Sequence, residues 1–245
     1  MYSLFYKSQT NPLPFIDEIT QEEEVTRILQ LIYAHPFNQQ LFSGTLSKNS
    51  FGSYLQDDFY YLHHYALMLQ QLSQRLHSYN LLKLSEQLNY MGTGIIEEEQ
   101  AMHQHYIQFY VEQKPSKAIV QYVEFLQNQV HEQPLYVALC SILPCFWIYY
   151  QLGQQAMKII QNNNVYQSWI HTYTGNSFVQ ATPDLVDNVN NLAAPASAHL
   201  RKEMKVAFMK AATHELTFFD AIIEQNFNMH LKSDELLTIS ASPLI

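Results

Sequence analysis

A cysteine directly follows a proline inside the most apolar stretch of the chain. Residues 133 to 157 carry no charged side chain, and within them Pro144 precedes Cys145. A proline inside a helix removes one amide donor and pushes away the carbonyl four residues back, so we expect a kink that exposes Cys145. A thiolate is the nucleophilic form of cysteine, which makes Cys145 a candidate nucleophile. The alternative is a small apolar side chain in a buried helix, the commoner role of cysteine.

Carboxylates occupy the apolar faces of two other predicted helices. In the stretch 51–72, helical spacing places Asp58 on a face that otherwise holds Phe, Tyr, Met and Leu. The same spacing in the last long helix places Glu215 among Leu, Met, Phe and Ile. A buried carboxylate costs free energy unless it is hydrogen-bonded, so each needs a partner or a task. Together they indicate a polar pocket in the core; the alternative is a structural hydrogen-bond network with the many tyrosines.

A third face holds Glu99 and His103, which are four residues apart. Di-iron carboxylate bundles use Glu-x-x-His on two helices with a carboxylate from each of two others, and this sequence contains no Glu-x-x-His. A di-metal oxidase built on Asp58, Glu99, His103 and Glu215 therefore remains an alternative, but we expect no metal and no cofactor.

Long periodic helical stretches must position these side chains. The chain has 245 residues with only six glycines and nine prolines, which favours an all-α protein forming one bundle of about seven or eight helices. We expect one domain over 1–245, with 231–245 as a surface tail. The predicted helices are Thr20–Ala34, a short piece ending at Ser43, Lys48–Ser78, 81–111 with a bend at Gly92 and Gly94, 117–130, 134–161, 165–172, 177–192 and 196–227.

Composition also limits which partners we expect the protein to bind and in which compartment we expect it to act. A formal net charge of −9 leaves no basic face for a phosphate backbone, so no nucleic-acid partner is expected. The uncharged run is interrupted by Pro144, Gln151 and Gly153, so we interpret it as a buried helix and expect no membrane contact. Cys140 and Cys145 lie five residues apart on one predicted helix and point to different faces, which is unsuited to a disulfide. The N-terminus lacks a secretory signal, and a cytoplasmic location fits best.

With a thiol, inward carboxylates and tyrosines in place, the chain resembles the TenA/thiaminase II family of aminopyrimidine hydrolases, and within it the cysteine-bearing branch. The family lies in the haem-oxygenase-like helical superfamily, so the resemblance implies a haem-oxygenase-like bundle. The likeness extends from about His35 to Phe219. Its signals, specific in their order and spacing, are Gly44-Thr45-Leu46 with Phe51, Tyr54 through Asp58 to Ala66, Glu99 with His103, Leu143 through Gly153, Tyr166 through Tyr173, and Glu215 with Phe218.

The resemblance implies roles for seven residues. Cys145 is expected to be the nucleophile, Glu215 the proton donor, and Tyr61 the tyrosine that helps to activate the thiol. Asp58 is expected to bind substrate. The remaining members of the expected substrate-binding set are aromatic: Tyr122, Tyr149 and Tyr173.

Three positions depart from the family pattern. Phe219 stands where the family often has Trp, Gln151 where Glu is common, and Thr174-Gly175-Asn176 where a paired glycine is usual. These differences bear on substrate preference more than on the chemistry.

The resemblance implies hydrolysis of 4-amino-5-aminomethyl-2-methylpyrimidine to the 5-hydroxymethyl compound in thiamin salvage, with thiamin cleavage as a side activity. It also implies a homotetramer. Besides the di-metal oxidase, the alternative is a non-catalytic pyrimidine-binding or regulatory protein.

Overall fold

Helices make up all the regular structure of residues 13–109, 114–160 and 163–240, which are the residues that the computed structural model describes. Within the helices, the side chains at 98–100, 103, 107, 176–177 and 226–240 lie outside the description. The elements are α1 (Phe15–Thr20), α2 (Glu23–Tyr33), α3 (Pro36–Ser43), α4 (Lys48–Ser78), α5 (Leu82–Tyr106), a 3₁₀ turn (Ile107–Phe109), α6 (Lys117–Glu132), α7 (Leu135–Ala156), α8 (Gln167–Thr172), α9 (Asn176–Ala193) and α10 (Ala198–Ser240). The all-α prediction is confirmed, but the described residues form ten α-helices where about seven or eight were predicted, because the N-terminal part and the segment after α7 contain additional short helices.

The second long helix begins and ends where the sequence predicts. Ser47 caps α4 by accepting a hydrogen bond from the Ser50 amide at 3.0 Å. After Ser78 the chain turns through Asn80, whose φ of 59° lies in the left-handed region that ends helices. Ser116 caps α6 in the same way, on the amide of Ile119. Local capping residues therefore determine where α4 and α6 begin.

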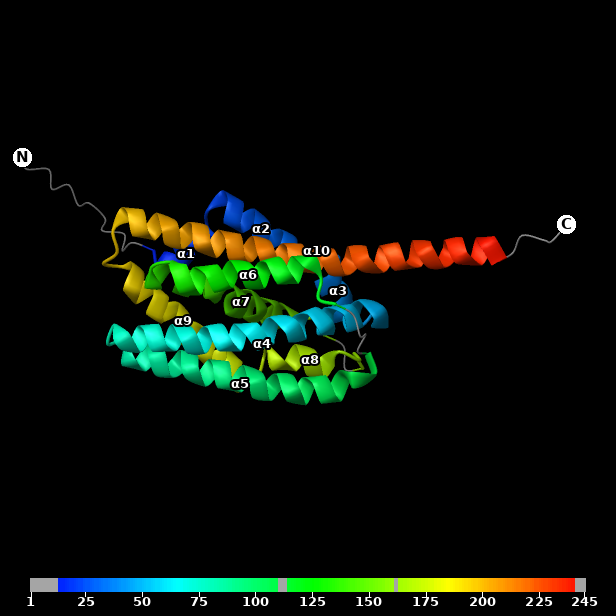
Figure 1. Cartoon of the computed structure of the whole chain (residues 1–245), viewed down its shortest axis with the longest axis horizontal. Helices are drawn as coiled ribbons and strands as arrows, with labels where there is room; N and C mark the ends of the chain where they lie inside the picture. The colour runs from blue at the N-terminus through cyan, green and yellow to red at the C-terminus, as the bar shows by residue number, and fades with distance from the viewer. Residues whose placement is uncertain (1–12, 110–113, 161–162, 241–245) are drawn as a thin grey trace, which may run out of the picture.

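Three predicted boundaries are wrong, and the simplest case is the helix predicted over 134–161, which ends at Ala156. Thr20 does not open a helix with a capping box: it is the last residue of α1, and its hydroxyl bonds back to the Asp17 carbonyl. The buried side chains Phe15, Ile16 and Ile19 give this short helix its own apolar face. The last helix does not stop near Phe227 but continues to Ser240, because no glycine or proline interrupts it. Its end extends beyond the other helices in Figure 1.

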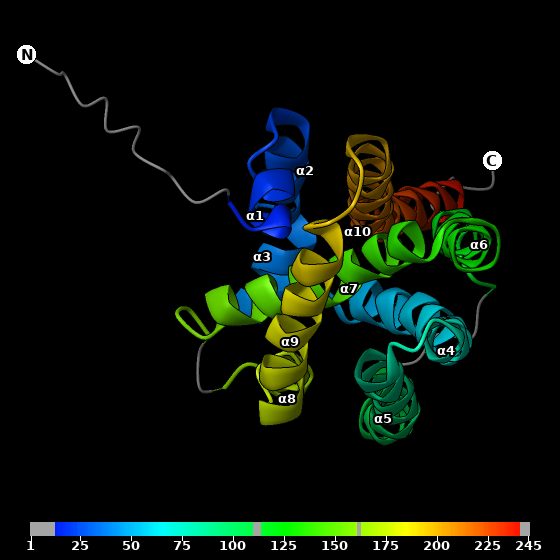
Figure 2. The same ribbon diagram turned by 90° about the vertical axis from the view of Figure 1, so that its left-hand side faces the viewer.

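Helix α7 is the centre of the bundle. It packs against α10, α9, α6 and α4, and it continues through the internal Pro144. Figure 2, which looks along several of the long helices, shows α7 crossing the bundle, passing behind α9 and approaching α6 and α4. By length and composition α7 could cross a membrane, but 78% of its most apolar window is buried inside the protein. The interpretation of this segment as a buried helix is confirmed.

Helix α5 lies close along α4 (Figure 1). A Cβ atom at Gly92 would come within 3.0 Å of the Ala66 carbonyl, so glycine permits this approach. Further along, Ser73 and Ser85 each donate a hydroxyl hydrogen bond to the other's carbonyl, at 2.7 and 2.8 Å. These contacts hold the two helices side by side along one wall of the site described below.

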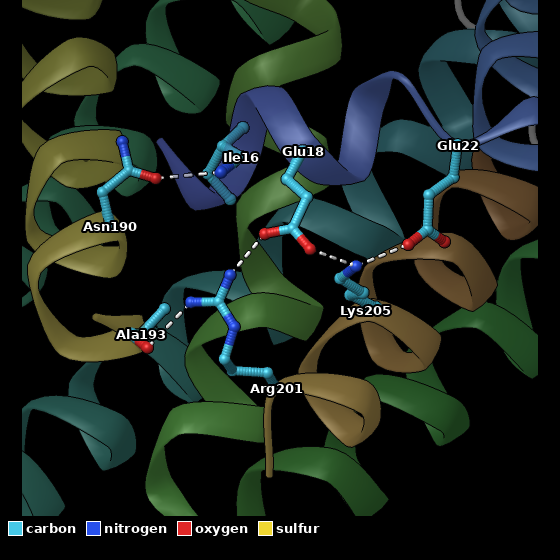
Figure 3. A network of polar contacts seen from close by, with 7 residues as sticks. All are labelled: Ile16, Glu18, Glu22, Asn190, Ala193, Arg201 and Lys205. Atoms are coloured by element: carbon cyan, nitrogen blue, oxygen red, sulfur yellow. Dashed lines mark hydrogen bonds and ion pairs between the residues drawn. The ribbon is translucent and has the colours of Figure 1, made fainter. Parts of the chain in front are cut away.

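A polar network joins the N-terminal helix to the start of α10 (Figure 3). Glu18 of α1 accepts hydrogen bonds from Arg201 and from Lys205, the latter at 2.7 Å. Asn190 of α9 accepts from the amide of Ile16 at 2.9 Å. The charged side chains are partly exposed, so each pair contributes little free energy. The network nevertheless links three segments that are far apart in the sequence.

Candidate active site

A cavity of about 110 Å³ lies between α4, α5, α7, α8 and the start of α9. Five of the seven predicted site residues line it: Asp58, Tyr61, Cys145, Tyr149 and Tyr173. The structure thus brings together side chains from three separate helical segments. The rest of the wall is mostly apolar or aromatic and consists of Leu55, Phe59, Leu62, Tyr65, Ile95, Met102, Phe146, Trp169, Thr172 and Phe178.

The Cys145 thiol is held in its neutral form. Burial raises its pKa well above the usual value, and the nearby Glu215 carboxyl raises it further. Asp58 acts in the same direction, whereas the nearby hydroxyls of Tyr61 and Tyr65 lower the pKa because they can stabilise the thiolate. A thiol in this setting must lose its proton when a substrate arrives, because only the thiolate is a strong nucleophile.

Two tyrosines of α4 stand beside the thiol with different hydrogen bonding. Tyr65 donates to the Ile142 carbonyl at 2.6 Å, which ties α4 to α7 one turn before Cys145. The Tyr61 hydroxyl is buried and makes no hydrogen bond of ordinary geometry among the described residues, although it is near enough to lower the Cys145 pKa. Its ring stacks against Tyr65 and Tyr122, with centroids 5.1 and 5.0 Å away. Tyr61 therefore has hydrogen-bonding capacity left for the thiol or for a ligand.

Glu215 lies behind this layer and not on the cavity wall. Its side chain on α10 is only 2% exposed, and its Oε1 accepts a hydrogen bond from the Tyr122 hydroxyl at 3.0 Å. Burial raises the Glu215 pKa to about 8, against the opposite effect of the Tyr122 hydrogen bond. The carboxyl therefore carries a proton at neutral pH, as a general acid requires. Tyr122, predicted as a pocket aromatic, contacts Glu215 and Tyr61 instead of lining the cavity.

Two consecutive aspartates of α4 serve different sides of the helix. Asp58 is 7% exposed, and it is the one carboxylate among the described residues that line the cavity. Asp57 is fully buried, and its Oδ1 accepts from the Ser116 amide at 2.8 Å, where α6 begins. Asp57 was not among the predicted site residues, since helical periodicity alone does not reveal a partner on another helix.

Tyr54 is a second residue at the site that the sequence did not predict. Its hydroxyl lies 3.4 Å from the Tyr149 hydroxyl and 3.1 Å from the Tyr173 hydroxyl. Gly153, one turn after Tyr149, lets the end of α8 approach α7, because a Cβ there would come within 2.8 Å of the Tyr173 carbonyl. The absence of a side chain at Gly153 therefore lets Tyr173, at the end of α8, lie against α7.

Two of the three departures from the family pattern lie off the cavity wall. Phe219 is fully buried and packs on Phe218 and Phe37, at centroid distances of 5.7 and 5.3 Å. Gln151 is only partly buried and does not line the cavity. Neither difference changes the surface that a ligand in the cavity would meet.

The metal alternative cannot be built from the described side chains. Among them, no group of three or more His, Cys, Asp or Glu residues is placed to hold a metal ion. The side chains of Glu99 and His103 lie outside the description, so that pair stays untested.

Comparison with known proteins gives consistent results. The TENA/THI-4/PQQC family model matches residues 22–225. The chain is 27% identical over 194 residues to the Aminopyrimidine aminohydrolase of Bacillus subtilis (strain 168), covering 76% of this chain and 81% of that protein. It is 25% identical over 203 residues to the Thiamine biosynthesis multifunctional protein ThiED of Corynebacterium glutamicum, covering 82% of this chain and 26% of that protein.

Solved structures share the fold. A TenA homologue from Pyrococcus furiosus has a TM-score of 0.77 at 17% identity, covering 85% of this chain and 99% of that one. A TenA homologue from P. horikoshii OT3 has a TM-score of 0.70 at 20% identity, covering 86% and 98%.

Proposed function

This chain belongs to the TENA/THI-4/PQQC family, and from that premise we propose that it is an aminopyrimidine aminohydrolase of thiamin salvage. Its substrate would be 4-amino-5-aminomethyl-2-methylpyrimidine and its product the 5-hydroxymethyl compound. The observation that carries the proposal is the arrangement of Cys145 on the cavity wall with the buried Glu215, whose pKa burial raises to about 8, near enough to raise the Cys145 pKa. The names of the relatives from B. subtilis and C. glutamicum, an aminopyrimidine aminohydrolase and a thiamine biosynthesis protein, point to the same substrate class.

The proposed reaction starts with addition of the Cys145 sulfur to the electron-poor pyrimidine ring. The S–C bond forms, the thiol proton passes to a ring nitrogen, and the ring loses its aromaticity. The adduct then expels the exocyclic amine as ammonia; its last proton comes from Glu215, which does not line the cavity, and would be relayed through the Tyr122 and Tyr61 hydroxyls. Water adds to the exposed methylene carbon and returns a proton to Glu215. Finally the S–C bond breaks, the sulfur regains its proton, and the aromatic ring is restored.

The cavity wall suits a flat, uncharged or cationic ring. Aromatic side chains surround the space, and Asp58 supplies a carboxylate that can accept hydrogen bonds from an amino group. Among the described residues that line the cavity, none is a lysine, arginine or histidine. This part of the wall offers no counter-charge to an anionic leaving group such as a phosphate ester, so unphosphorylated aminopyrimidines are the preferred class, with thiamin cleavage as a side activity.

The remaining parts of the proposal concern the whole protein. We assign the catalytic unit to one domain that acts in the cytoplasm as a homotetramer, without a metal or an organic cofactor and without nucleic-acid or membrane partners. The formal net charge of −9 supports the absence of a nucleic-acid partner.

Parallel incubation with the aminomethylpyrimidine and with thiamin tests the function. Product formation is followed by chromatography for each substrate separately. We expect the aminomethylpyrimidine to yield the hydroxymethyl compound and ammonia in equal amounts, faster than thiamin is cleaved. Binding of both compounds without turnover of either would instead support a pyrimidine-binding or regulatory protein.

A further inference from the structure

Helix α6 is held at both ends by side chains of α4, the helix along which it lies (Figure 1). At its start, the Asp57 carboxyl accepts a hydrogen bond from the amide of Ser116, the N-cap residue, at 2.8 Å. At its end, the Arg75 guanidinium donates to the carbonyl of Val130 and to that of Gln133, the C-cap residue, the latter at 2.8 Å. An acceptor at the start and a cation at the end are the groups that helix ends need, because the first amides and the last carbonyls have no partner within the helix.

The spacing of these two end contacts relates the position of α6 to that of α4. At a rise of about 1.5 Å per residue, Asp57 and Arg75 are about 27 Å apart along α4, and Ser116 and Gln133 are about 26 Å apart along α6. Because the two spans match, both end contacts form at the same register of the two helices. A slide of α6 by one turn, about 5.4 Å, would break both contacts.

The burial of Asp57 indicates a role in position more than in stability. Its side chain is fully buried, and its Oδ2 has no hydrogen-bond partner among the described residues. Burying a carboxyl group with one oxygen unbonded costs free energy. A buried polar group that adds little stability can still specify how two helices align.

The register of α6 determines where Tyr122 lies. Tyr122 is on the part of α6 between the two end contacts, and it is 1% exposed. Its ring stacks on that of Tyr61 with centroids 5.0 Å apart, and its hydroxyl donates to Glu215 at 3.0 Å. Since Tyr61 belongs to α4 and Glu215 to α10, the Tyr122 hydroxyl reaches Glu215 while its ring stays on Tyr61 only if α6 keeps this register.

We propose that Asp57 and Arg75 are positioning residues, which set the register of α6 so that Tyr122 connects Glu215 to Tyr61 beside the cavity. The proposal rests on the proposed function, in which the proton of Glu215 reaches the leaving amine through the Tyr122 and Tyr61 hydroxyls. Neither positioning residue lines the cavity, so neither contacts the substrate. Their loss should therefore slow proton transfer without weakening substrate binding.

Steady-state kinetics with the aminomethylpyrimidine test this in Asp57→Ala and Arg75→Ala. Each variant removes one end contact and so displaces Tyr122, and kcat should fall by roughly 10-fold while KM changes by less than about 2-fold. Asp57→Asn keeps an oxygen that can accept from the Ser116 amide, so its kcat should stay within about 2-fold of wild type. In a Tyr122→Phe background, Asp57→Ala should lower kcat by less than about 2-fold further, because the side chain that it positions has already lost its hydroxyl.

Asn190→Ala and Arg201→Ala are the matched controls. The Asn190 side chain accepts from the amide of Ile16 at the start of α1 at 2.9 Å, and Arg201 donates to the carbonyl of Ala193 at the end of α9 at 3.0 Å. Both variants remove the same kind of helix-end contact, but from helices other than the one that carries Tyr122. They should lower the melting temperature and keep the wild-type kcat.

Three results would overturn the proposal. The first is a wild-type kcat in Asp57→Ala and Arg75→Ala with a melting temperature lowered as in the controls, and the second is a full 10-fold further loss when Asp57→Ala is added to Tyr122→Phe. The third is a loss in Asp57→Asn as large as that in Asp57→Ala. In all three the proposed function would stand, because wild type turns over the substrate. If wild type did not turn over the aminomethylpyrimidine, the proposed function would fail and the inference with it.

Discussion

At neutral pH the Glu215 carboxyl keeps its proton, because burial raises its pKa to about 8. Glu215→Gln preserves the shape and the hydrogen bond from Tyr122 but removes the transferable proton. We expect turnover to fall by roughly 10²-fold with little change in substrate affinity. Steady-state kinetics give both quantities. A lower melting temperature with unchanged turnover would make Glu215 a structural residue.

The pH dependence of the same group provides a second prediction. The protonated acid predominates below about pH 8, so turnover should decline as the pH rises through that value. The folded-state pKa is raised above the ordinary glutamate pKa of 4.5, so the native state binds more protons than the unfolded state between these values. The free energy of unfolding should therefore fall as the pH rises from about 4.5 to 8. Denaturant titrations of wild type and Glu215→Gln should differ in this window, the variant lacking the decline; parallel curves would exclude the assigned pKa.

For individual residues, the sequence predicts which side chains point inward but not which of them are in contact. Helical periodicity correctly turns Asp58 and Glu215 to the core. The hydrogen bond from Tyr122 to Glu215 joins residues 93 positions apart, and it depends on how α6 and α10 pack. Tyr54 is missed for the same reason, because its partners lie on other helices.

Among the helical elements, the close approach of α7 to the end of α8 is the most sensitive to change. In Gly153→Ala the new Cβ would lie 2.8 Å from the Tyr173 carbonyl and 3.1 Å from the Tyr173 Cβ, so the segment must shift. Because Tyr173 would move away from Tyr149, we expect KM to rise by roughly 10-fold, and overpacking to cost about 1–3 kcal/mol. Kinetics and thermal unfolding measure the two effects.

Gly94→Ala is the control for that substitution. A Cβ at Gly94 meets nothing within 4 Å, so alanine should raise helix stability by up to about 1 kcal/mol and leave KM unchanged. Equal behaviour of the two variants would show that the predicted clash at Gly153 has no effect on the site.

The same elements show where sequence reasoning succeeds and fails. The bounds of α4 follow from strong local signals, the Ser47 cap and the left-handed Asn80. The capping pattern at Thr20 predicts a helix start that the structure does not have, because an equally local apolar pattern just before Thr20 forms α1. Boundaries that depend on one signal are predictable, whereas competing signals are decided by packing.

For the whole molecule, the proposed chemistry requires no metal. The sequence lacks Glu-x-x-His, and a thiol with a protonated carboxyl suffices for the steps described. Dialysis against a chelator should leave turnover unchanged, and elemental analysis should find less than one metal ion per chain. Stoichiometric iron or manganese together with loss of activity on chelation would favour the di-metal oxidase and require Glu99 and His103 as ligands.

The central claim is that Cys145 attacks the pyrimidine ring, and turnover of the aminomethylpyrimidine by two matched cysteine variants tests it most directly. Both cysteines are free and buried on α7, but only Cys145 lines the cavity. A hydroxyl is a far weaker nucleophile than a thiolate at neutral pH. We predict that Cys145→Ser nearly abolishes formation of the hydroxymethylpyrimidine with the fold intact, while Cys140→Ser keeps turnover near that of wild type. Wild-type turnover by the Cys145→Ser protein would contradict the account.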